Sequence, residues 1–371
     1  MPLLSIVRNF TGEKNMTATP QDITDFKDID LFAYAERLGF GNIHLKVDKE
    51  TGLRAIIAVH NTKLGPAIGG TRFISYDSTD LAIKDALRLA RGMTYKAAIC
   101  NLKHGGAKSV IINHGNITDR QKLFEVFGRF VDELGGVYIA AMDSGVTVAD
   151  MDAIQKSTKH VTCTSDSPDK GDPSPSTALG VLRGIQAAVK FKLGRDDLEG
   201  LHIAIQGVGN VGGKLAGYLY ERGAKLTVCD ARPENAEYCA KEFGAKIVSV
   251  DDIYDVECDL FAPCALGAII NDDTIPHLKT KMIVGAANNQ LAVMKFDQVL
   301  RDKGILYLPD FLVNSGGLIH VAGIYETGDP QYAHNAILGI YDEALNLLER
   351  AQKENKPTNQ IALQIVEERL A

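Results

Sequence analysis

The 371-residue sequence has no tryptophan and only six cysteines, none of them in a CxxC pair. Because zinc sites and redox-active dithiols use such close pairs, we expect these cysteines to be buried, reduced thiols. The nine histidines form no HExxH motif and no ligand cluster. We therefore predict no metal site, and a metal-dependent hydrolase has no ligand set in this chain.

Long apolar runs and basic runs are also missing. No stretch approaches the roughly 20 apolar residues that span a bilayer, and the segment from Met1 to Asp22 lacks the apolar region of a signal peptide. The formal net charge is −7, and no basic segment reverses that sign locally. We therefore expect a cytoplasmic protein that binds neither membranes nor nucleic acid.

The length and composition indicate two globular domains. Hydrophobic residues make up 45% of the chain and charged residues 23%, with 35 glycines. A Ser/Asp/Pro/Gly-rich segment, CTSDSPDKGDPSP, runs from Cys163 to Pro175 and breaks regular structure. We place one domain at 1–165 and a second at 173–340, and we expect residues from about 345 to 371 to return to the first.

The first domain reads as a mixture of strands and helices after an irregular extension of about 25 residues. Ser78 is a suitable N-cap for a helix with apolar residues at helical spacing. The predicted elements are a hairpin over 43–60, a helix over 78–96, a strand over 108–112, a helix over 118–134 and a strand over 137–141.

The second domain alternates helices with short apolar strands. The predicted helices cover 176–191, 211–222 and 233–243, and the predicted strands cover 201–206 and 225–229 and lie near 247, 260, 283 and 306. Such alternation is typical of a parallel, doubly wound sheet. We therefore predict an α/β fold with an N-terminal α/β domain, a C-terminal Rossmann domain and a cleft between them.

A glycine-rich turn lies between the first strand and helix of the predicted Rossmann domain. In this context a GxGxxG motif indicates a dinucleotide site, with the pyrophosphate at the helix N-terminus. Its residues are Gly207, Val208, Gly209, Asn210, Val211 and Gly212. Asp230 ends the next strand, where a carboxylate accepts hydrogen bonds from the adenosine ribose and repels a 2′-phosphate. We predict NAD as the cofactor and keep NADP as a minor alternative, because Arg232 lies two residues further on.

Three segments of the first domain combine small residues with an ionisable side chain. They are 65–72, which ends in Arg72, then 92–96 together with 105–108, which carry Lys96 and Lys108, and then 140–145, which contains Asp143. Taken alone, a lysine is more often a solvated surface charge than a catalyst, and an aspartate such as Asp143 also suits a turn or a helix cap. Together they would supply a cation for a carboxylate, a lysine base and a proton relay.

Several motifs in order along the chain resemble the glutamate/leucine/phenylalanine/valine dehydrogenase family, and within it the leucine-specific branch. They are LGPAIGGTR, DALRLARGMTYKAA, GGAKSVII, Pro-Ser-Pro-Ser-Thr at 173–177, QGVGNVG, FAPCALGAIIND, GAANNQL and PDFLVNSGGLI. The resemblance spans about Leu64 to Ile319. It implies a homo-oligomer that oxidatively and reversibly deaminates an L-amino acid to a 2-oxo acid, ammonia and NADH.

The resemblance also implies roles for individual residues. Lys96 would bind the substrate carboxylate, Lys108 would be the catalytic lysine and Asp143 the proton relay. The remaining candidates are Gly69 and Gly70 as pocket floor, Thr177 at the nicotinamide carboxamide, Asn288 and Asn289 beside the nicotinamide ribose and substrate, and Ile68, Ala141, Leu318 and Val321 as side-chain lining.

That apolar lining favours a branched aliphatic side chain, leucine first, and disfavours glutamate, whose carboxylate would lose its hydration. Phenylalanine, tryptophan and valine remain alternative substrates, and a non-catalytic NAD-binding regulator is the alternative from another class. The chain departs from the family pattern at Ala107, before the catalytic lysine, at His104, and in Met142-Asp143-Ser144-Gly145, where Glu-Asp-Val-Gly is usual.

Overall fold

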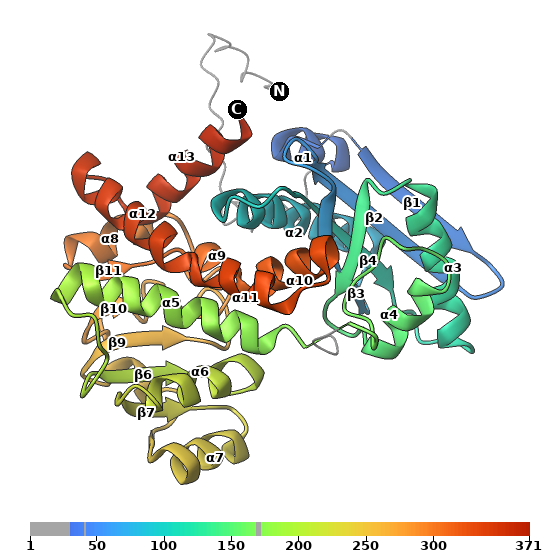
Figure 1. Cartoon of the computed structure of the whole chain (residues 1–371). Coiled ribbons are helices and arrows are strands. Elements are labelled where there is room, and N and C mark those ends of the chain that lie inside the picture. The colour runs from blue at the N-terminus through green and yellow to red at the C-terminus, as the bar shows by residue number, and fades with distance from the viewer. Residues whose placement is uncertain (1–29, 41, 168–171) are drawn as a thin grey trace, which may run out of the picture.

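Two β-sheets, each covered by helices, form the two lobes of this computed structural model (Figure 1), which describes residues 30–40, 42–167 and 172–371. The irregular N-terminal extension expected over the first 25 residues, and part of the linker after Cys163, lie outside the described residues. Within the described ranges, no helix has both the length and the apolar character needed to cross a bilayer.

The first lobe is built on a mixed sheet, which has five strands among the described residues, in the order β1-β2-β4-β3-β5. The strands β3, β4 and β5 are parallel, whereas β1, β2 and β4 pair in antiparallel fashion. Their bounds are β1 Asn42–Asp48, β2 Leu53–Asn61, β3 Ala67–Ile74, β4 Gly105–Ile112 and β5 Tyr138–Met142.

Strand β3 is the main feature of this lobe that the sequence analysis missed. The sequence analysis assigned no element to this segment, because glycine is depleted in strands. The structure explains the glycine: a Cβ on Gly69 would lie 1.8 Å from the carbonyl oxygen of Ala107 on the neighbouring strand. Strand β3 therefore needs glycine at this position to fit beside β4. Strand β4 also begins three residues before its predicted start at Lys108.

Helices of the first lobe pack against both faces of this sheet. Ser78 caps α2 as predicted, since its Oγ accepts the N–H of Leu81 over 3.2 Å. The helix continues past its predicted end at Lys96, and two short helices, α1 and α4, were not predicted. The bounds are α1 Leu31–Leu38, α2 Thr79–Ile99, α3 Arg120–Glu133 and α4 Val148–Gln155.

The second lobe has the parallel, doubly wound sheet expected from the alternation of helices and strands. Its order in the described residues is β11-β10-β9-β6-β7-β8, and every neighbouring pair is parallel. The strands are β6 His202–Gln206, β7 Lys225–Cys229, β8 Lys246–Ile247, β9 Cys258–Pro263, β10 Thr280–Ile283 and β11 Leu306–Tyr307. The flanking helices are α5 Ser174–Leu193, α6 Asn210–Tyr220, α7 Pro233–Phe243, α8 Lys295–Asp302 and α9 Asp310–Val313.

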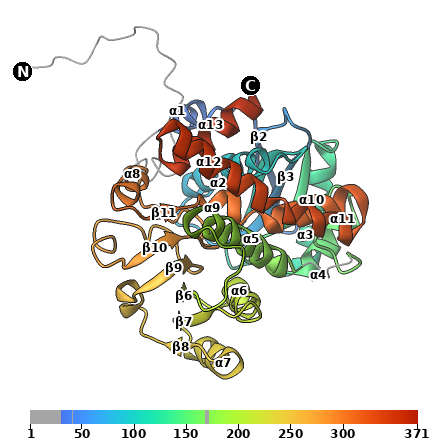
Figure 2. The ribbon, with the colours of Figure 1, turned by 60° about the vertical axis from the view of Figure 1, so that its left-hand side comes forward.

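The C-terminal helices connect the lobes. Helix α10 places Leu318 and Val321 in the core of the first lobe, whereas α12 packs along α5 of the second. Helix α13 then lies against α2 (Figure 2), where Arg369 donates to the carbonyl of Ala98 over 2.9 Å. The bounds are α10 Gly316–Thr327, α11 Pro330–Leu338, α12 Ile340–Glu354 and α13 Thr358–Leu370.

Candidate active site

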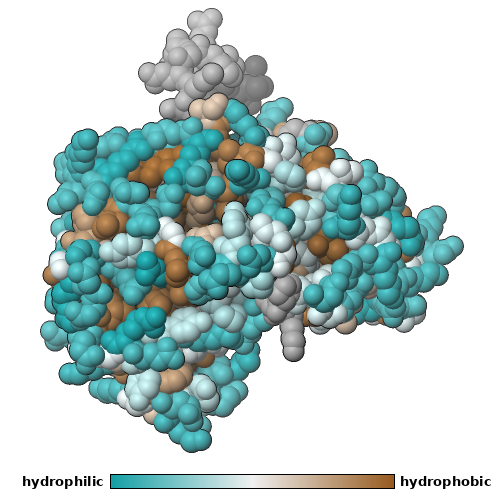
Figure 3. Space-filling view, viewed as in Figure 1, coloured by the Kyte–Doolittle hydropathy of each residue, from teal (hydrophilic) through white to brown (hydrophobic). Residues whose placement is uncertain are grey.

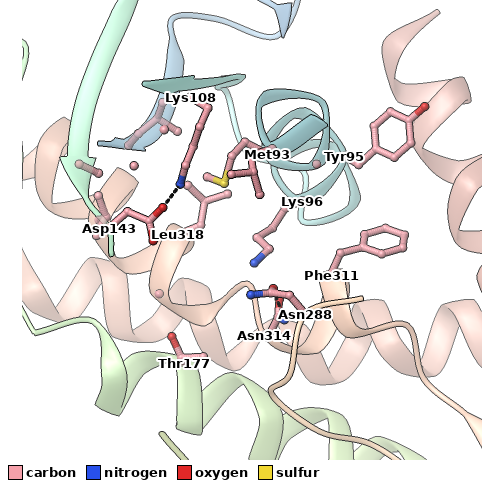
Figure 4. A pocket seen from close by; sticks show the side chains of 18 of the residues that line it. Met93, Tyr95, Lys96, Lys108, Asp143, Thr177, Asn288, Phe311, Asn314 and Leu318 are labelled. Atoms are coloured by element: carbon pink, nitrogen blue, oxygen red, sulfur yellow. Dashed lines mark hydrogen bonds and ion pairs between the residues drawn. The ribbon is translucent and has the colours of Figure 1, made fainter. Parts of the chain in front are cut away.

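A cavity of about 410 Å³ opens between the two lobes, and both lobes line it (Figure 4). The neighbouring parallel strands β3, β4 and β5 of the first lobe all contribute to its wall: β3 over 68–72, β4 through Lys108, and β5 through Ala141 and Met142 at its carboxyl end. All the substrate-site candidates from the sequence lie around it, together with Thr177 and Asn288: Ile68, Gly69, Gly70, Lys96, Lys108, Ala141, Asp143, Asn289, Leu318 and Val321.

Lys108 and Asp143 form an ion pair at the first-lobe wall of the cavity. Lys108 Nζ donates to Oδ2 of Asp143, and only 7% of the lysine side chain and 23% of the aspartate side chain are exposed. Gly70 leaves room for the pair, because a Cβ there would lie 2.9 Å from Lys108 Nζ and 2.7 Å from the Asp143 Cβ. The glycine is therefore part of the geometry that brings the amine and the carboxylate together.

Burial determines the protonation chemistry of this pair. Desolvation lowers the pKa of Lys108, with Asp143 opposing the shift. Burial acts to raise the pKa of Asp143, but the charges of Lys108 and Arg72 outweigh it and hold that pKa at about 2. A lysine that loses its proton more easily than usual, beside a carboxylate that stays ionised, is suited to general base catalysis.

Lys96 lies on α2 and points across the cavity toward Asn288 and Asn314 (Figure 4). Burial lowers its pKa, while the negative charge of Asp310 on the second lobe acts in the opposite direction. An ammonium group in this position is free to meet an anionic group of a ligand in the cavity. Because Lys96 lies on α2 and Lys108 lies on β4, the cavity has two separate amines.

The second-lobe wall carries a turn held by side-chain hydrogen bonds. Asn289 has a left-handed backbone (φ 53°), and its N–H donates to Oδ2 of Asp310 over 2.6 Å. Asn314 Nδ2 donates to Oδ1 of Asn288 over 2.8 Å and to the carbonyl of Ala286 over 3.0 Å. These contacts fix the position of Asn288 at the cavity edge.

Asp310 and Asn314 are cavity residues that the sequence analysis did not single out, although both belong to the quoted motif PDFLVNSGGLI. Arg72, from the motif LGPAIGGTR, also lines the cavity, and the sequence analysis gave it no role. Motif membership was the only available signal, because nothing in the local sequence shows that these polar side chains face a shared cavity.

A second cavity, of about 790 Å³, lies at the glycine-rich turn between β6 and α6. Gly207 has φ +87°, and a Cβ on Gly212 would lie 2.0 Å from the Gly207 carbonyl oxygen, so both are needed for the tight strand-to-helix turn. A Cβ on Gly209 would meet no atom within 4 Å, because that position faces open space. Such a turn fits a pyrophosphate lying against the backbone at a helix N-terminus.

The predicted dinucleotide residues do not all face this cavity. Gly207, Val208, Gly209, Asn210 and Asp230 line it, whereas Val211 and Gly212 are not among its lining residues and contribute to the packing of α6 instead. Thr177 lines the interlobe cavity, and its Oγ1 donates to the carbonyl of Pro173 over 3.1 Å.

The Asp230 carboxylate is held in place by two backbone N–H groups. Its Oδ2 accepts the N–H of Val208 over 2.8 Å, and its Oδ1 accepts the N–H of Arg232 over 2.9 Å. The carboxylate is thereby fixed at the edge of the cavity, where its charge disfavours a 2′-phosphate. Arg232 lines the same cavity. Among the described residues, no group of three His, Cys, Asp or Glu side chains is placed to hold a metal ion.

Two family models of known proteins match the chain, one in each lobe. Residues 39–160 match the family model described as Glu/Leu/Phe/Val dehydrogenase, dimerisation domain, and residues 232–324 match the Glutamate/Leucine/Phenylalanine/Valine dehydrogenase model. The chain is 48% identical to leucine dehydrogenase of Geobacillus stearothermophilus over 92% of its own length and 94% of the relative's. Phenylalanine dehydrogenase of Thermoactinomyces intermedius is 41% identical over 92% of this chain and 94% of its own.

A solved structure supports the same assignment. L-tryptophan dehydrogenase from Nostoc punctiforme superposes with a TM-score of 0.81 at 42% identity, covering 92% of this chain and 98% of the other. The motifs, the two-lobe fold, the matched models and the relatives agree. The chain therefore belongs to the glutamate/leucine/phenylalanine/valine dehydrogenase family.

Proposed function

We propose that the chain catalyses the reversible, NAD-dependent oxidative deamination of a branched-chain aliphatic L-amino acid, with leucine preferred. As a member of this family it is an amino-acid dehydrogenase that uses NAD(H). The observation that carries the proposal is the convergence of Lys96, Lys108 and Asp143 on one cavity between the lobes. The cofactor, when bound, accepts the hydride from the substrate Cα.

Lys96 binds the substrate in this proposal. Its ammonium pairs with the carboxylate of the amino acid, and Asn288 and Thr177 border the same space from the second lobe. Holding the carboxylate at one end orients the Cα–H toward the second lobe. The cavity excludes bulk water around the charged groups, and this strengthens their interactions.

Lys108 and Asp143 carry out the proton transfers. Loss of hydride from Cα leaves a substrate iminium. Neutral Lys108 removes a proton from a water molecule as that water adds to the iminium carbon. Asp143, which accepts from the Lys108 amine, relays that proton to the nitrogen of the resulting carbinolamine. Lys108, neutral again, then takes the proton of the carbinolamine hydroxyl as the C=O double bond forms and the C–N bond breaks, so ammonia departs and the 2-oxo acid remains. The depressed pKa of Lys108 supports the role of base.

The substrate preference rests on the apolar side of the cavity. Ile68, Ala141, Leu318 and Val321 offer no cation to a side-chain carboxylate, so glutamate is disfavoured. Phenylalanine, tryptophan and valine remain alternatives, because a methylene in such a pocket changes binding by only about 1–3 kcal/mol. The higher identity to a relative named leucine dehydrogenase than to one named phenylalanine dehydrogenase supports leucine first.

An initial-rate screen of L-amino acids with NAD or NADP tests the proposal, with NADH absorbance as the readout. We expect leucine to give the highest kcat/KM and NAD to be preferred over NADP. Fastest turnover of phenylalanine or tryptophan would replace leucine with an aromatic substrate. Tight NAD binding without turnover of any amino acid would favour a non-catalytic NAD-binding regulator.

The assembly and location are further parts of the proposal. We expect a cytoplasmic homo-oligomer that associates through the first lobe, whose matched family model is described as a dimerisation domain. Strand β1 is the edge of the first sheet in the described residues, and its Leu45 and Val47 side chains are 61% and 69% exposed. The face in Figure 3 is mostly hydrophilic, with scattered hydrophobic patches.

A further inference from the structure

A network of charged side chains continues from Asp143 along the wall of the cavity to helix α2. Arg72, on β3, donates from Nε to Oδ2 of Asp143 over 3.3 Å and from Nη1 to Oδ2 of Asp85 over 2.8 Å. The guanidinium therefore bridges the site carboxylate and a second carboxylate on α2. Neither Arg72 nor Asp85 has a role in the chemistry described above.

Asp85 is in turn held from two sides. The Tyr76 hydroxyl donates to its Oδ2 over 2.7 Å, and Arg88 Nη2 donates to its Oδ1 over 2.9 Å. The side chains of Asp85 and Arg72 are only 16% and 20% exposed. A planar guanidinium clamped between two largely buried carboxylates has little freedom, so it fixes the direction of whatever it binds.

We propose that Arg72 is a positioning residue for the deamination: anchored by Asp85, it aims the Asp143 carboxylate at the Lys108 amine and sets the pH range in which that amine acts as base. This inference rests on the proposed function, in which Lys108 is the base and Asp143 is the proton relay. It adds two residues that act on the chemistry through Asp143 and Lys108.

The electrostatics support this geometry. After burial and Asp143, the positive charge of Arg72 is a further cause that lowers the pKa of Lys108, whereas the negative charge of Asp85 acts to raise it. The pKa of Asp143, about 2, lies far below any assay pH, so a moderate change there leaves Asp143 ionised.

Other groups face the pair from the surrounding elements. Lys96 on α2 is close enough to influence the charge of Lys108, and Tyr138 on β5 is coupled to Asp143. Helix α10 presents Leu318 and Val321, which carry no charge. These groups are the same in all the variants below. A shift in the pH profile therefore measures the effect of the substitution at Arg72 or Asp85.

The two substitutions are expected to shift the profile in opposite directions. Arg72→Met removes a cation, so Lys108 holds its proton more tightly and the rising limb of kcat/KM moves to higher pH. Asp85→Asn removes an anion, so the limb moves to lower pH. A purely structural role for the two residues would not give shifts of opposite sign.

The experiment measures kcat/KM against pH for oxidative deamination of the best amino-acid substrate. At the foot of the rising limb, kcat/KM of Arg72→Met should be about tenfold below that of the natural chain, and the deficit should disappear as the pH is raised. Arg72→Lys keeps the charge and should restore the limb, with lower kcat because an ammonium group does not reproduce the planar bridge between the two carboxylates. Arg350→Met is the matched control, since Arg350 also pairs with two carboxylates but lies on α12, and it should leave the profile unchanged.

The inference is overturned if neither limb moves, or if Arg72→Met and Asp85→Asn move it in the same direction. If Arg72→Met fails to fold, as judged by its circular dichroism, Asp85→Asn decides the matter: a limb at lower pH supports the inference, and an unmoved limb refutes it. Absence of turnover in the natural chain would instead refute the proposed function.

Discussion

The two lysines of the cavity differ because different side chains surround them. Lys108 contacts Asp143 directly and is almost fully buried, whereas Lys96 is influenced by Asp310 from the opposite lobe. Burial lowers the pKa of both. The carboxylate in contact with Lys108 gives that lysine a proton partner, and the open side of Lys96 leaves it available for a substrate carboxylate.

Gly70 provides a test of this geometry at a single residue. In Gly70→Ala the added methyl meets the Asp143 Cβ at 2.7 Å and Lys108 Nζ at 2.9 Å, so the pair must move apart. We expect kcat to fall about 100-fold, because small displacements at reacting groups cost about this much. Thermal melts should show a loss of only about 1–3 kcal/mol of stability. A kcat within threefold of the natural chain would show that the spacing is not critical.

At the scale of elements, the sequence predicted the second lobe better than the first. Short apolar strands that alternate with helices favour a parallel, doubly wound sheet, and Asp230 could be placed at a strand end without coordinates. Strand β3 was missed because Gly69 is required by a neighbouring backbone, a tertiary cause invisible in local sequence. The roles of Arg72 and Asp310 were missed for a similar reason, since their partners lie on distant segments.

Asp297 links two elements, because it lies on α8 and its Oδ2 accepts the N–H of Asn359 at the start of α13 over 2.8 Å. Burial raises its pKa from 3.8 to about 6. The folded state thus disfavours the ionised form, so the stability contribution of this group is present below pH 3.8 and is lost as the pH rises through about 6.

We therefore expect Asp297→Asn to become more stable relative to the natural chain by up to about 3 kcal/mol as the pH rises from 4 to 7. Parallel thermal melts of the two chains across this range measure the difference. A stability difference that stays constant with pH would show that folding does not raise the pKa of Asp297.

At the scale of the whole molecule, the cavity depends on elements that reach across the two lobes. Helix α10 supplies Leu318 and Val321 both to the cavity and to the first-lobe core. Helix α13 lies on α2, the helix that carries Lys96, and Arg369 also pairs with Glu343 of α12 over 2.9 Å. The relative position of the lobes, and with it the distance between the amines and the second-lobe wall, is set by these connections.

The proposed assembly is also testable at this scale. Leu45→Lys with Val47→Lys places two extra charges on the exposed side chains of β1, and we expect a smaller assembly by size-exclusion chromatography with light scattering. Ile247→Lys on β8, an edge strand of the second sheet, is the matched control and should leave the mass unchanged. An unchanged mass in the double variant would exclude β1 as the interface.

The central claim is that the buried amine of Lys108 is the base of the deamination. The most direct measurement is single-turnover and steady-state kcat of Lys108→Ala at saturating amino acid and NAD, with NAD affinity measured separately. We predict a loss of about 10²–10⁴ in kcat with unchanged NAD binding. A variant that binds NAD and turns over at close to the natural rate would contradict the account.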